Sequence, residues 1–430
     1  MRNVSLSLSI IIIACSCSDN EPRFERHEKH PIESDSQFPR TIQDAINIAA
    51  NASKWLYDED CTSRSDIRSI NPSEIKIMST SAKSRSTGVD TLMYVVNYAD
   101  SMGFALVPKN PAAPSVMAVT VAGHYDPNVP VENPPFNDYI KSVINYLSLL
   151  PIDSLAKPPI GGGLQPGCEK TVYDTTWIKH IPPRVKVRWS QRNPYGIECP
   201  NGIAGCSNTA VAMMMTYFEH PKTIELTYKP EQPVVNLDWK AMKKHRTSTK
   251  WGTFCACHPN QETIHLMIAQ LCREIGHRSG TIYLEQSSGT YTSGTMEALK
   301  SLGYTSLSYH SCNKLSVANA LDNQSMLLME GDDKHGKGAH MWLCDGVKYY
   351  KLTAYRYITT DVGLTWKPDG GPLWTSEECY NFFHWGDTSG NYAGYYRDMY
   401  FQPIDKTSQE PSEYDFCIWP AFTKVTFNSH

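Results

Sequence analysis

A cysteine at the start of a predicted helix is the residue of this chain best placed for covalent chemistry. Cys206 follows Gly205, and the residues from Ser207 to Phe218 are apolar on nearly every side of a helix that Pro221 closes. The unpaired N–H groups and dipole of a helix N-terminus favour an anion, so they lower the pKa of a thiol there. The stretch alone equally fits a small buried residue, because cysteine is among the most buried residue types.

Two other side chains have the types that a nucleophilic cysteine needs. His340 stands on a small-residue approach to a predicted strand, and such a cysteine takes a base that is distant in sequence but adjacent in the fold. Gln191 precedes Cys206, and an amide donor near the nucleophile can bind an oxyanion. Taken singly, Gln191 also fits a surface amide, and His340 also fits a surface or core histidine.

Hydrophobic periodicity predicts the elements that would position these residues. Helical spacing is found over 41–56, 136–150, 206–219, 263–275 and 293–302, with Thr41 as the candidate N-cap of the first. Strand-like runs occupy 92–97, 103–107 and 116–121, and further runs follow residue 325. In the C-terminal part helices come first and strands later, which predicts an α+β domain with an antiparallel sheet.

Composition shifts divide the chain into five segments. A stretch with four glycines and few apolar anchors separates two globular parts and is the best domain boundary. We predict a lipoprotein-type signal peptide (1–17), a polar tether (18–40), a small α+β domain (41–150), a linker with a cleavage region (151–173) and a second domain (174–430).

The first residues predict export. Arg2 precedes a short apolar run, Val4–Ala14, which is too short to span a bilayer and fits the apolar part of a signal peptide. Cys15 or Cys17 then fits the cysteine that bacterial lipoproteins modify with lipid, although a plain secretory signal is the alternative. A lipid anchor is therefore the only membrane attachment that we expect.

Charge and cysteine content exclude some classes and leave others open. With 40 basic and 44 acidic residues intermixed, nothing favours a nucleic acid as partner. Of 13 cysteines, the two at the signal leave an odd number, so at least one thiol should stay unpaired after export. Cys255–His258 holds three potential ligands, but without a second pair at zinc spacing we predict a disulfide or surface loop and no metal.

Five ordered segments resemble the streptopain family, which comprises secreted bacterial cysteine peptidases with a papain-like fold. They span 187–396 and read WSQRNPYG, GCSNTAVAMMMTYFEHP, the segment from IAQLCREIGHRSG to ALKSLGY, GAHMWLCDGV, and FHWGDTSGNYAGYY. The strands in MYVVNYADSMGFALV are similar to those of the family's propeptide. The resemblance implies an α+β fold class: a papain-like cysteine peptidase domain, with a helical part plus an antiparallel sheet, preceded by a small α+β propeptide domain.

The same resemblance implies roles for site residues. Cys206 is the nucleophile, His340 its general base and acid, Gln191 an oxyanion-hole donor, and Trp385 part of an aromatic wall; no cofactor is implied. The chain departs from the family pattern at two places. His384 replaces the asparagine that would orient the catalytic histidine, and Asp387 replaces a second tryptophan, so each is a candidate orienter.

These expectations combine into one hypothesis with two alternatives. The chain is expected to be an exported cysteine endopeptidase, lipid-anchored at the bacterial envelope or released after processing, that acts on proteins or peptides. It is made as a zymogen whose 41–150 unit blocks the site until cleavage within 156–174, with Lys157 and Lys170 as candidate positions. A catalytically weakened surface binding protein, supported only by His384 and Asp387, is one alternative. A Cys/His acyl transferase is the other.

Overall fold

The computed structural model describes eleven stretches of the chain. They are residues 39–57, 69–79, 91–131, 133–150, 169–244, 261–311, 315–331, 339–358, 367–386, 392–398 and 421–427. The predicted signal peptide, nearly all of the tether, most of the linker, and Cys255–His258 lie outside the described residues.

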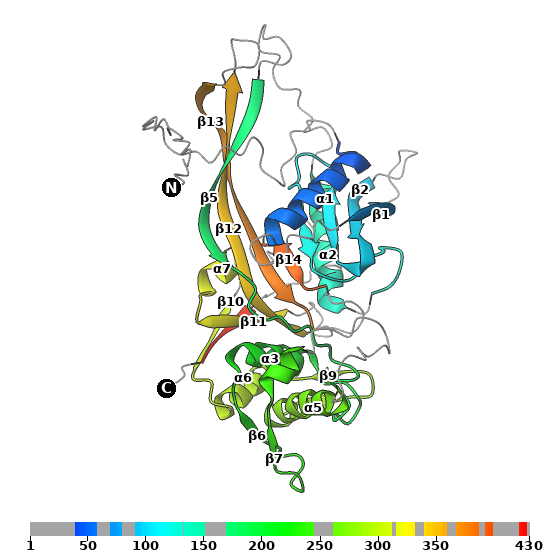
Figure 1. Cartoon of the computed structure of the whole chain (residues 1–430), viewed down its shortest axis with the longest axis vertical. Helices are drawn as coiled ribbons and strands as arrows, with labels where there is room; N and C mark the ends of the chain where they lie inside the picture. Colours follow the sequence, from blue (N-terminus) through cyan, green and yellow to red (C-terminus); the bar gives the residue numbers. More distant parts are fainter. Residues whose placement is uncertain are drawn as a thin grey trace, which may run out of the picture.

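One antiparallel sheet runs through the described part of the chain (Figure 1). Its strands follow the order β1-β2-β3-β4-β14-β13-β12-β11-β15-β10, and β5 pairs with β12 beside this path. The strands are β1 (Ile70–Ser79), β2 (Thr91–Tyr98), β3 (Phe104–Pro108), β4 (Ala118–Thr120), β5 (Glu169–Ile181), β10 (Ser306–Ser311), β11 (Ser325–Gly331), β12 (His340–Ile358), β13 (Lys367–His384), β14 (Gly394–Arg397) and β15 (Ala421–Thr426).

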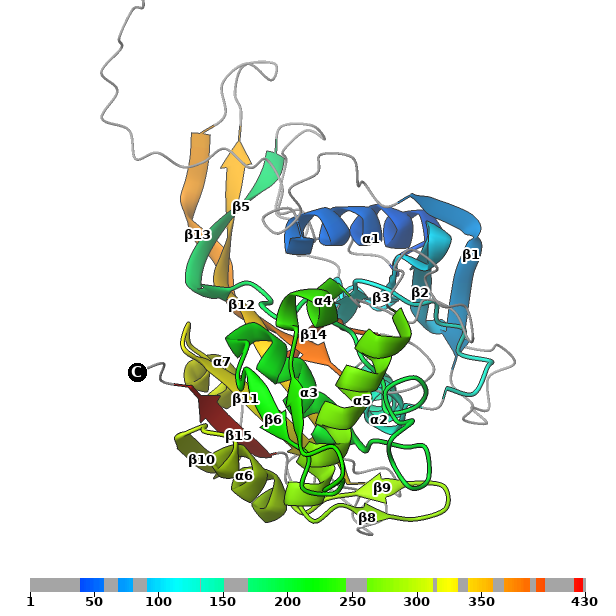
Figure 2. The ribbon, with the colours of Figure 1, turned by 60° about the horizontal axis from the view of Figure 1, so that its bottom comes forward.

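Helices cover the sheet in two groups, as Figures 1 and 2 show. The N-terminal group is α1 (Ile42–Tyr57) and α2 (Pro134–Leu149). The C-terminal group is α3 (Cys206–Phe218), α4 (Trp239–Lys244), α5 (Gln261–Arg278), α6 (Thr292–Ser301) and α7 (Ser316–Ala320). Short elements complete the chain: the 3₁₀ turn η1 (Ala99–Ser101), the pair β6 (Thr223–Glu225) and β7 (Val234–Asn236), and the pair β8 (Ile282–Tyr283) and β9 (Ser288–Gly289).

The predicted α+β class is therefore confirmed, with a helical part plus an antiparallel sheet that follow a smaller α+β unit. Each of the five predicted helices is present, with ends within three residues of the prediction. Thr41 caps α1 as expected, because its Oγ1 accepts from the Asp44 N–H and its own N–H reaches the Asp44 carboxylate. Helix α2 begins two residues early, because Asn133 caps it ahead of two prolines.

Helix α3 is the centre of the C-terminal part, and its sequence explains its position. Every residue from Ser207 to Thr216 is buried. The helix packs against β12 on one side and α5 on another (Figure 2). A helix that is apolar all round has to be buried on all sides. The first residue of α3, Cys206, is thus held rigidly beside the first residue of β12.

The N-terminal unit, defined here as α1, α2 and β1–β4, joins the C-terminal unit through a shared sheet. Strand β4 pairs with β14, and the backbone N–H of Val121 also donates to the Ala393 carbonyl. Two clusters of buried side chains combine residues of both units. Within the described residues, the two units therefore form one continuous structure across the predicted domain boundary.

Candidate active site

Cys206 is half-buried at the first position of α3. Gly205, the residue before it, has φ +95°, and a Cβ built there would lie 3.4 Å from Ser288 and from the Asn208 amide. Only glycine adopts such a conformation readily, and the absence of a side chain keeps the approach to the thiol open. Thr209 fixes this end of the helix, since its N–H and hydroxyl both donate to the Gly205 carbonyl.

Gln191 belongs to the loop that leads to Cys206. Its backbone carbonyl accepts the N–H of Ala204 at 2.7 Å, which ties residue 191 to a point two residues before the thiol. On the other side of this loop, Ser288 donates from its hydroxyl to the Ile203 carbonyl at 2.8 Å. The backbone near Gln191 is therefore held beside the start of α3 from two directions.

His340 begins β12, directly across from Cys206. The N–H of Met341, the next residue, donates to the Cys206 Sγ at 3.4 Å. His340 is itself buried, and it pairs with Gly331 at the end of β11. The structure thus brings the two principal predicted residues together, although 133 residues of chain lie between them.

The surroundings of the thiol favour its charged form. Burial raises the pKa of Cys206, but the charge and hydrogen bond of His340 lower it, as do the N–H groups of Met341 and Ser207. The lowering contributions win, so the pKa of Cys206 lies below the ordinary thiol value. A histidine and a thiol in this relation can form a thiolate–imidazolium pair.

The second ring nitrogen of His340 is held by backbone. Its Nε2 lies 3.1 Å from the Trp385 carbonyl oxygen. A carbonyl can only accept, so Nε2 carries the proton and donates, which leaves Nδ1 for the thiol. The Trp385 ring is buried, and it packs on Trp342 at 5.2 Å and Tyr396 at 5.1 Å between ring centroids. Trp385 therefore contributes its backbone carbonyl to His340, while its ring packs among buried aromatic side chains.

The structure places His384 away from His340. In register, His384 pairs with Leu343, so its side chain shares the face of Leu343, which packs toward α3. His340 is offset by an odd number of residues from Leu343, so it points to the opposite face. The Nε2 of His384 instead lies 3.0 Å from the Asp345 carboxylate. The resemblance implies that the side chain at position 384 orients His340. In this structure the backbone carbonyl of Trp385 makes the contact with His340 instead.

Asp345 is the buried site residue that the sequence analysis missed. It is fully buried, and besides His384 it accepts the backbone N–H groups of Arg184 and Val185 at 2.7 and 2.6 Å. The signal was an acidic residue inside the apolar run HMWLCDGV, since a charge there needs buried partners. Asp387, Cys15 and Cys17 lie outside the described residues.

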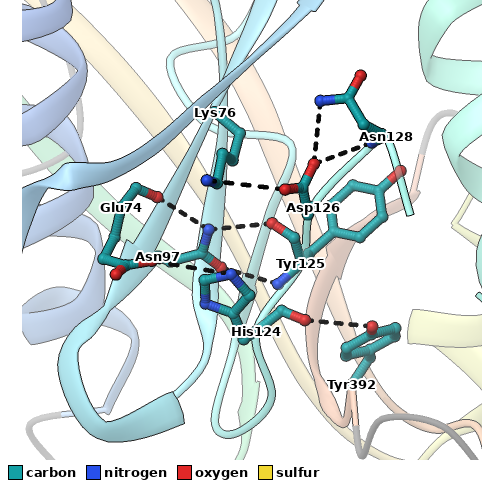
Figure 3. Close-up of polar contacts among 8 residues, drawn as sticks. All are labelled: Glu74, Lys76, Asn97, His124, Tyr125, Asp126, Asn128 and Tyr392. Atoms are coloured by element: carbon teal, nitrogen blue, oxygen red, sulfur yellow. Dashed lines mark hydrogen bonds and ion pairs between the residues drawn. The ribbon is translucent and has the colours of Figure 1, made fainter.

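Aromatic residues of both units meet beside Trp385. Tyr396 of β14 contacts Tyr139 of α2 with ring centroids 5.0 Å apart. The preceding Tyr392 inserts into a group of rings from the N-terminal unit, and its hydroxyl donates to the His124 carbonyl at 3.3 Å (Figure 3). The N-terminal unit therefore packs on the sheet face that carries His340 and Trp385.

The cysteines, the potential metal ligands and the predicted membrane attachment lie only partly within the described ranges. The five cysteines in the described ranges, Cys206 among them, are all free thiols, and the remaining cysteines lie outside those ranges. In the same part of the chain no group of three or more His, Cys, Asp or Glu side chains could hold a metal ion. No helix there is both long and apolar enough to cross a membrane.

Comparison with known proteins supports the resemblance seen in the motifs. Residues 189–396 match the model of the peptidase C10 family, the streptopain family. This range contains Cys206, His340 and Trp385, and it supports a cysteine peptidase. Among solved structures, a fragment of Prevotella intermedia prointerpain A is similar at 16% identity and a TM-score of 0.47, covering 83% of this chain and 99% of that one. No curated protein matches.

Proposed function

From the peptidase C10 match over residues 189–396 we propose that the chain is a cysteine endopeptidase made as a zymogen, with Cys206 as nucleophile and His340 as its base. The observation that carries the proposal is the meeting of the first residues of α3 and β12. There the Met341 N–H contacts the thiol at 3.4 Å, and the pKa of Cys206 is lowered, with His340 contributing the largest lowering effect.

The proposed reaction has two halves. The Cys206 thiolate attacks the peptide carbonyl carbon, and the amide of Gln191 and the Cys206 N–H donate to the oxygen that becomes negative. The His340 imidazolium then gives its proton to the leaving amine, and the acyl group stays on sulfur. In the second half His340 removes a proton from water, the hydroxide attacks the thioester carbon, and the C–S bond breaks. The acid is released and the thiolate–imidazolium pair is regenerated. The Trp385 carbonyl supports the imidazolium through Nε2.

We propose the N-terminal unit as the inhibitor of this site. It packs on the sheet face that carries His340, through contacts such as Tyr139 on Tyr396. Of the two candidate cleavage positions, Lys170 lies in β5 and pairs with Tyr357 of β12. A protease must draw its substrate into an extended single strand, so a residue already paired in a sheet is a poor target. Cleavage is therefore expected before β5, closer to Lys157.

Export remains a proposal that rests on the first residues. Arg2, the apolar run after it and the cysteines Cys15 and Cys17 support a lipid-anchored protein of the bacterial envelope. Partition of the expressed protein into a detergent phase would support the anchor, and replacing both cysteines by serine should move the protein to the aqueous phase. A parent protein found in the aqueous phase would favour the plain secretory signal.

The two alternatives have less support. The binding-protein hypothesis depends on the loss of the orienting asparagine, but the Trp385 carbonyl engages His340 without it. An acyl transferase would use the same Cys206 and His340, and it would form an amine adduct where a peptidase forms a free carboxylate. Adding a primary amine acceptor to the reaction and weighing the products distinguishes these two outcomes.

The test of the proposed function is casein cleavage by the protein that begins at Asp19, in the presence of thiol. The linker is first cut with an external protease, which is then inhibited, and a Cys206→Ala protein is treated identically. Cleavage by the parent alone supports the proposal. A folded, linker-cut parent that stays silent, including after its N-terminal unit has been separated, would contradict it.

A further inference from the structure

We propose that Asp345 is a positioning residue for the reaction, acting through His384 to hold the Trp385 carbonyl against His340. The inference rests on the proposed function, because it assigns a role within that site. It extends the site from the atoms that touch the reacting groups to a buried carboxylate on the opposite face of the sheet.

The Asp345 carboxylate is surrounded by donors. Oδ2 accepts the N–H groups of Arg184 and Val185, and Oδ1 accepts the Nε2–H of His384 at 3.0 Å. Burial raises the pKa of Asp345, but His384, the Val185 N–H and the Arg184 charge lower it below the usual range. The group is therefore a carboxylate, and charge-assisted hydrogen bonds of this kind are roughly twice as strong as neutral ones.

Among the described residues the His384 side chain makes one hydrogen bond, and its partner is Asp345. Its Nδ1 is buried and has no hydrogen-bond partner among the described residues. A buried imidazole nitrogen without a partner is costly, and the hydrogen bond from the other nitrogen to Asp345 offsets part of that cost. Removal of that contact would leave nothing polar to fix the orientation of His384 at the end of β13.

The Trp385 carbonyl is fixed from both sides. The peptide before it is anchored by the His384–Asp345 hydrogen bond. After it comes Gly386, with φ +67°, where a built Cβ would lie 3.5 Å from Thr209 and Met213 of α3. The end of β13 therefore lies against α3, the helix that begins with Cys206. A shift at His384 would be transmitted directly to the carbonyl that accepts the His340 Nε2–H.

Asp345 also connects this turn with the other strands of the site. It lies on β12 five residues after His340, and its two backbone donors belong to the segment that leads toward Gln191. The Asp345 carboxylate thus links three parts of the site. These are β12, which carries His340, the residue before Trp385, and the segment that leads to Gln191. This arrangement is what a positioning residue requires, since small displacements of a catalytic group reduce rates strongly.

A matched pair of variants at His384 tests the inference in the linker-cut protein, assayed after its N-terminal unit has been separated. His384→Gln retains an N–H donor for Asp345, whereas His384→Leu removes it at similar size. We expect His384→Leu to lower kcat by about tenfold to a hundredfold with little change in KM. Its Cys206 should also require a higher pH for half-maximal alkylation by iodoacetamide, while His384→Gln recovers most of both properties. Asp345→Asn should resemble His384→Leu, and combining the two should add little.

Asp322→Asn is the control for loss of a carboxylate, because the Asp322 carboxylate pairs with Lys424 of β15, whereas His384 bonds to Asp345. Its kcat and alkylation profile should match the parent. The inference would be overturned if His384→Leu and His384→Gln had the same kcat and the same alkylation profile. Asp345 would then have a purely structural role, even if the Tm of both variants were lowered. A parent that stays inactive after its N-terminal unit has been separated would contradict the proposed function instead, and the alkylation profiles would still decide the positioning role.

Discussion

Tyr392 should decide whether the two units separate after the linker is cut. Its ring is buried and lies among three rings of the N-terminal unit, with centroids 4.6 Å from Phe136, 5.3 Å from Phe104 and 6.3 Å from Tyr125. Its hydroxyl reaches the carbonyl of His124 in the same unit (Figure 3). Since all these contacts cross between the units, Tyr392→Ala should weaken their association more than it weakens either unit.

The size of the effect follows from the burial of this ring. Truncating a buried aromatic side chain to alanine costs about 3–5 kcal/mol. Each 1.4 kcal/mol is a factor of ten in affinity, so Tyr392→Ala should raise the Kd between the units by about a hundredfold to a few thousandfold. Tyr392→Phe loses only the hydroxyl contact to His124, about 0.5–1.5 kcal/mol, and should change the Kd by about tenfold or less.

The parent should stay assembled after cleavage, because more than this ring holds the units together. Strand β4 pairs with β14, and the Arg397 N–H donates to the Met117 carbonyl. A native mass measurement of the linker-cut parent should show both fragments in one species, with low casein cleavage. Linker-cut Tyr392→Ala should dissociate on dilution and gain activity as it does so.

Two results would refute this reasoning. A parent that falls apart as soon as the linker is cut would mean that the shared sheet contributes little to association. A Tyr392→Ala protein that stays assembled at the parent's concentration range would mean that the ring cluster is not the main attachment. Tyr392→Phe serves in both cases as the control for changes at this position that keep the ring.

Three further predictions concern the site itself. Iodoacetamide should alkylate Cys206 at pH values below the ordinary thiol pKa, because His340 lowers the pKa of this thiol. In His340→Ala only burial and the backbone donors act on the thiol, so the midpoint of alkylation should move to higher pH. Gln191→Ala should lower kcat by about a hundredfold to a thousandfold with KM nearly unchanged, as steady-state peptide cleavage would show. Gly205→Ala should lower the unfolding free energy by about 1–2 kcal/mol in a denaturant titration, because φ +95° is strained for any side chain.

The local structure around Cys206 could be predicted from the sequence because its signals are local. The sequence predicts this helix over 206–219, and α3 ends at Phe218, since the apolar run at its centre and Pro221 define it. The start of α2, which Asn133 caps, is a second example of a boundary that local signals define. A capping asparagine before two prolines moves the start of α2 forward, and both features were visible in the chain.

The pairing of distant strands could not be predicted. Residues 169–173 were assigned to the linker, yet β5 begins at Glu169 and pairs with β12 as far as Ile358. A strand pattern does not reveal its partner, and these partners are more than 160 residues apart along the chain. The orientation of His384 is an intermediate case. Alternation along β13 predicts that His384 and Trp385 lie on opposite faces of the sheet. Only the register with β12 shows which of these two residues lies on the same face as His340.

The two units are joined by more than the covalent linker, because the sheet continues from one unit into the other through β4 and β14. Separated at that boundary, β4 and β14 would each become an exposed sheet edge, and Tyr392 and Tyr396 would lose the rings that bury them. Proteins generally protect such edges, because unpaired strands recruit other chains. The N-terminal unit therefore stabilises the C-terminal unit while it covers the face of His340. Under the proposed function, inhibition is linked to folding, so cutting the linker alone removes a chain connection but leaves the contacts between the two units in place.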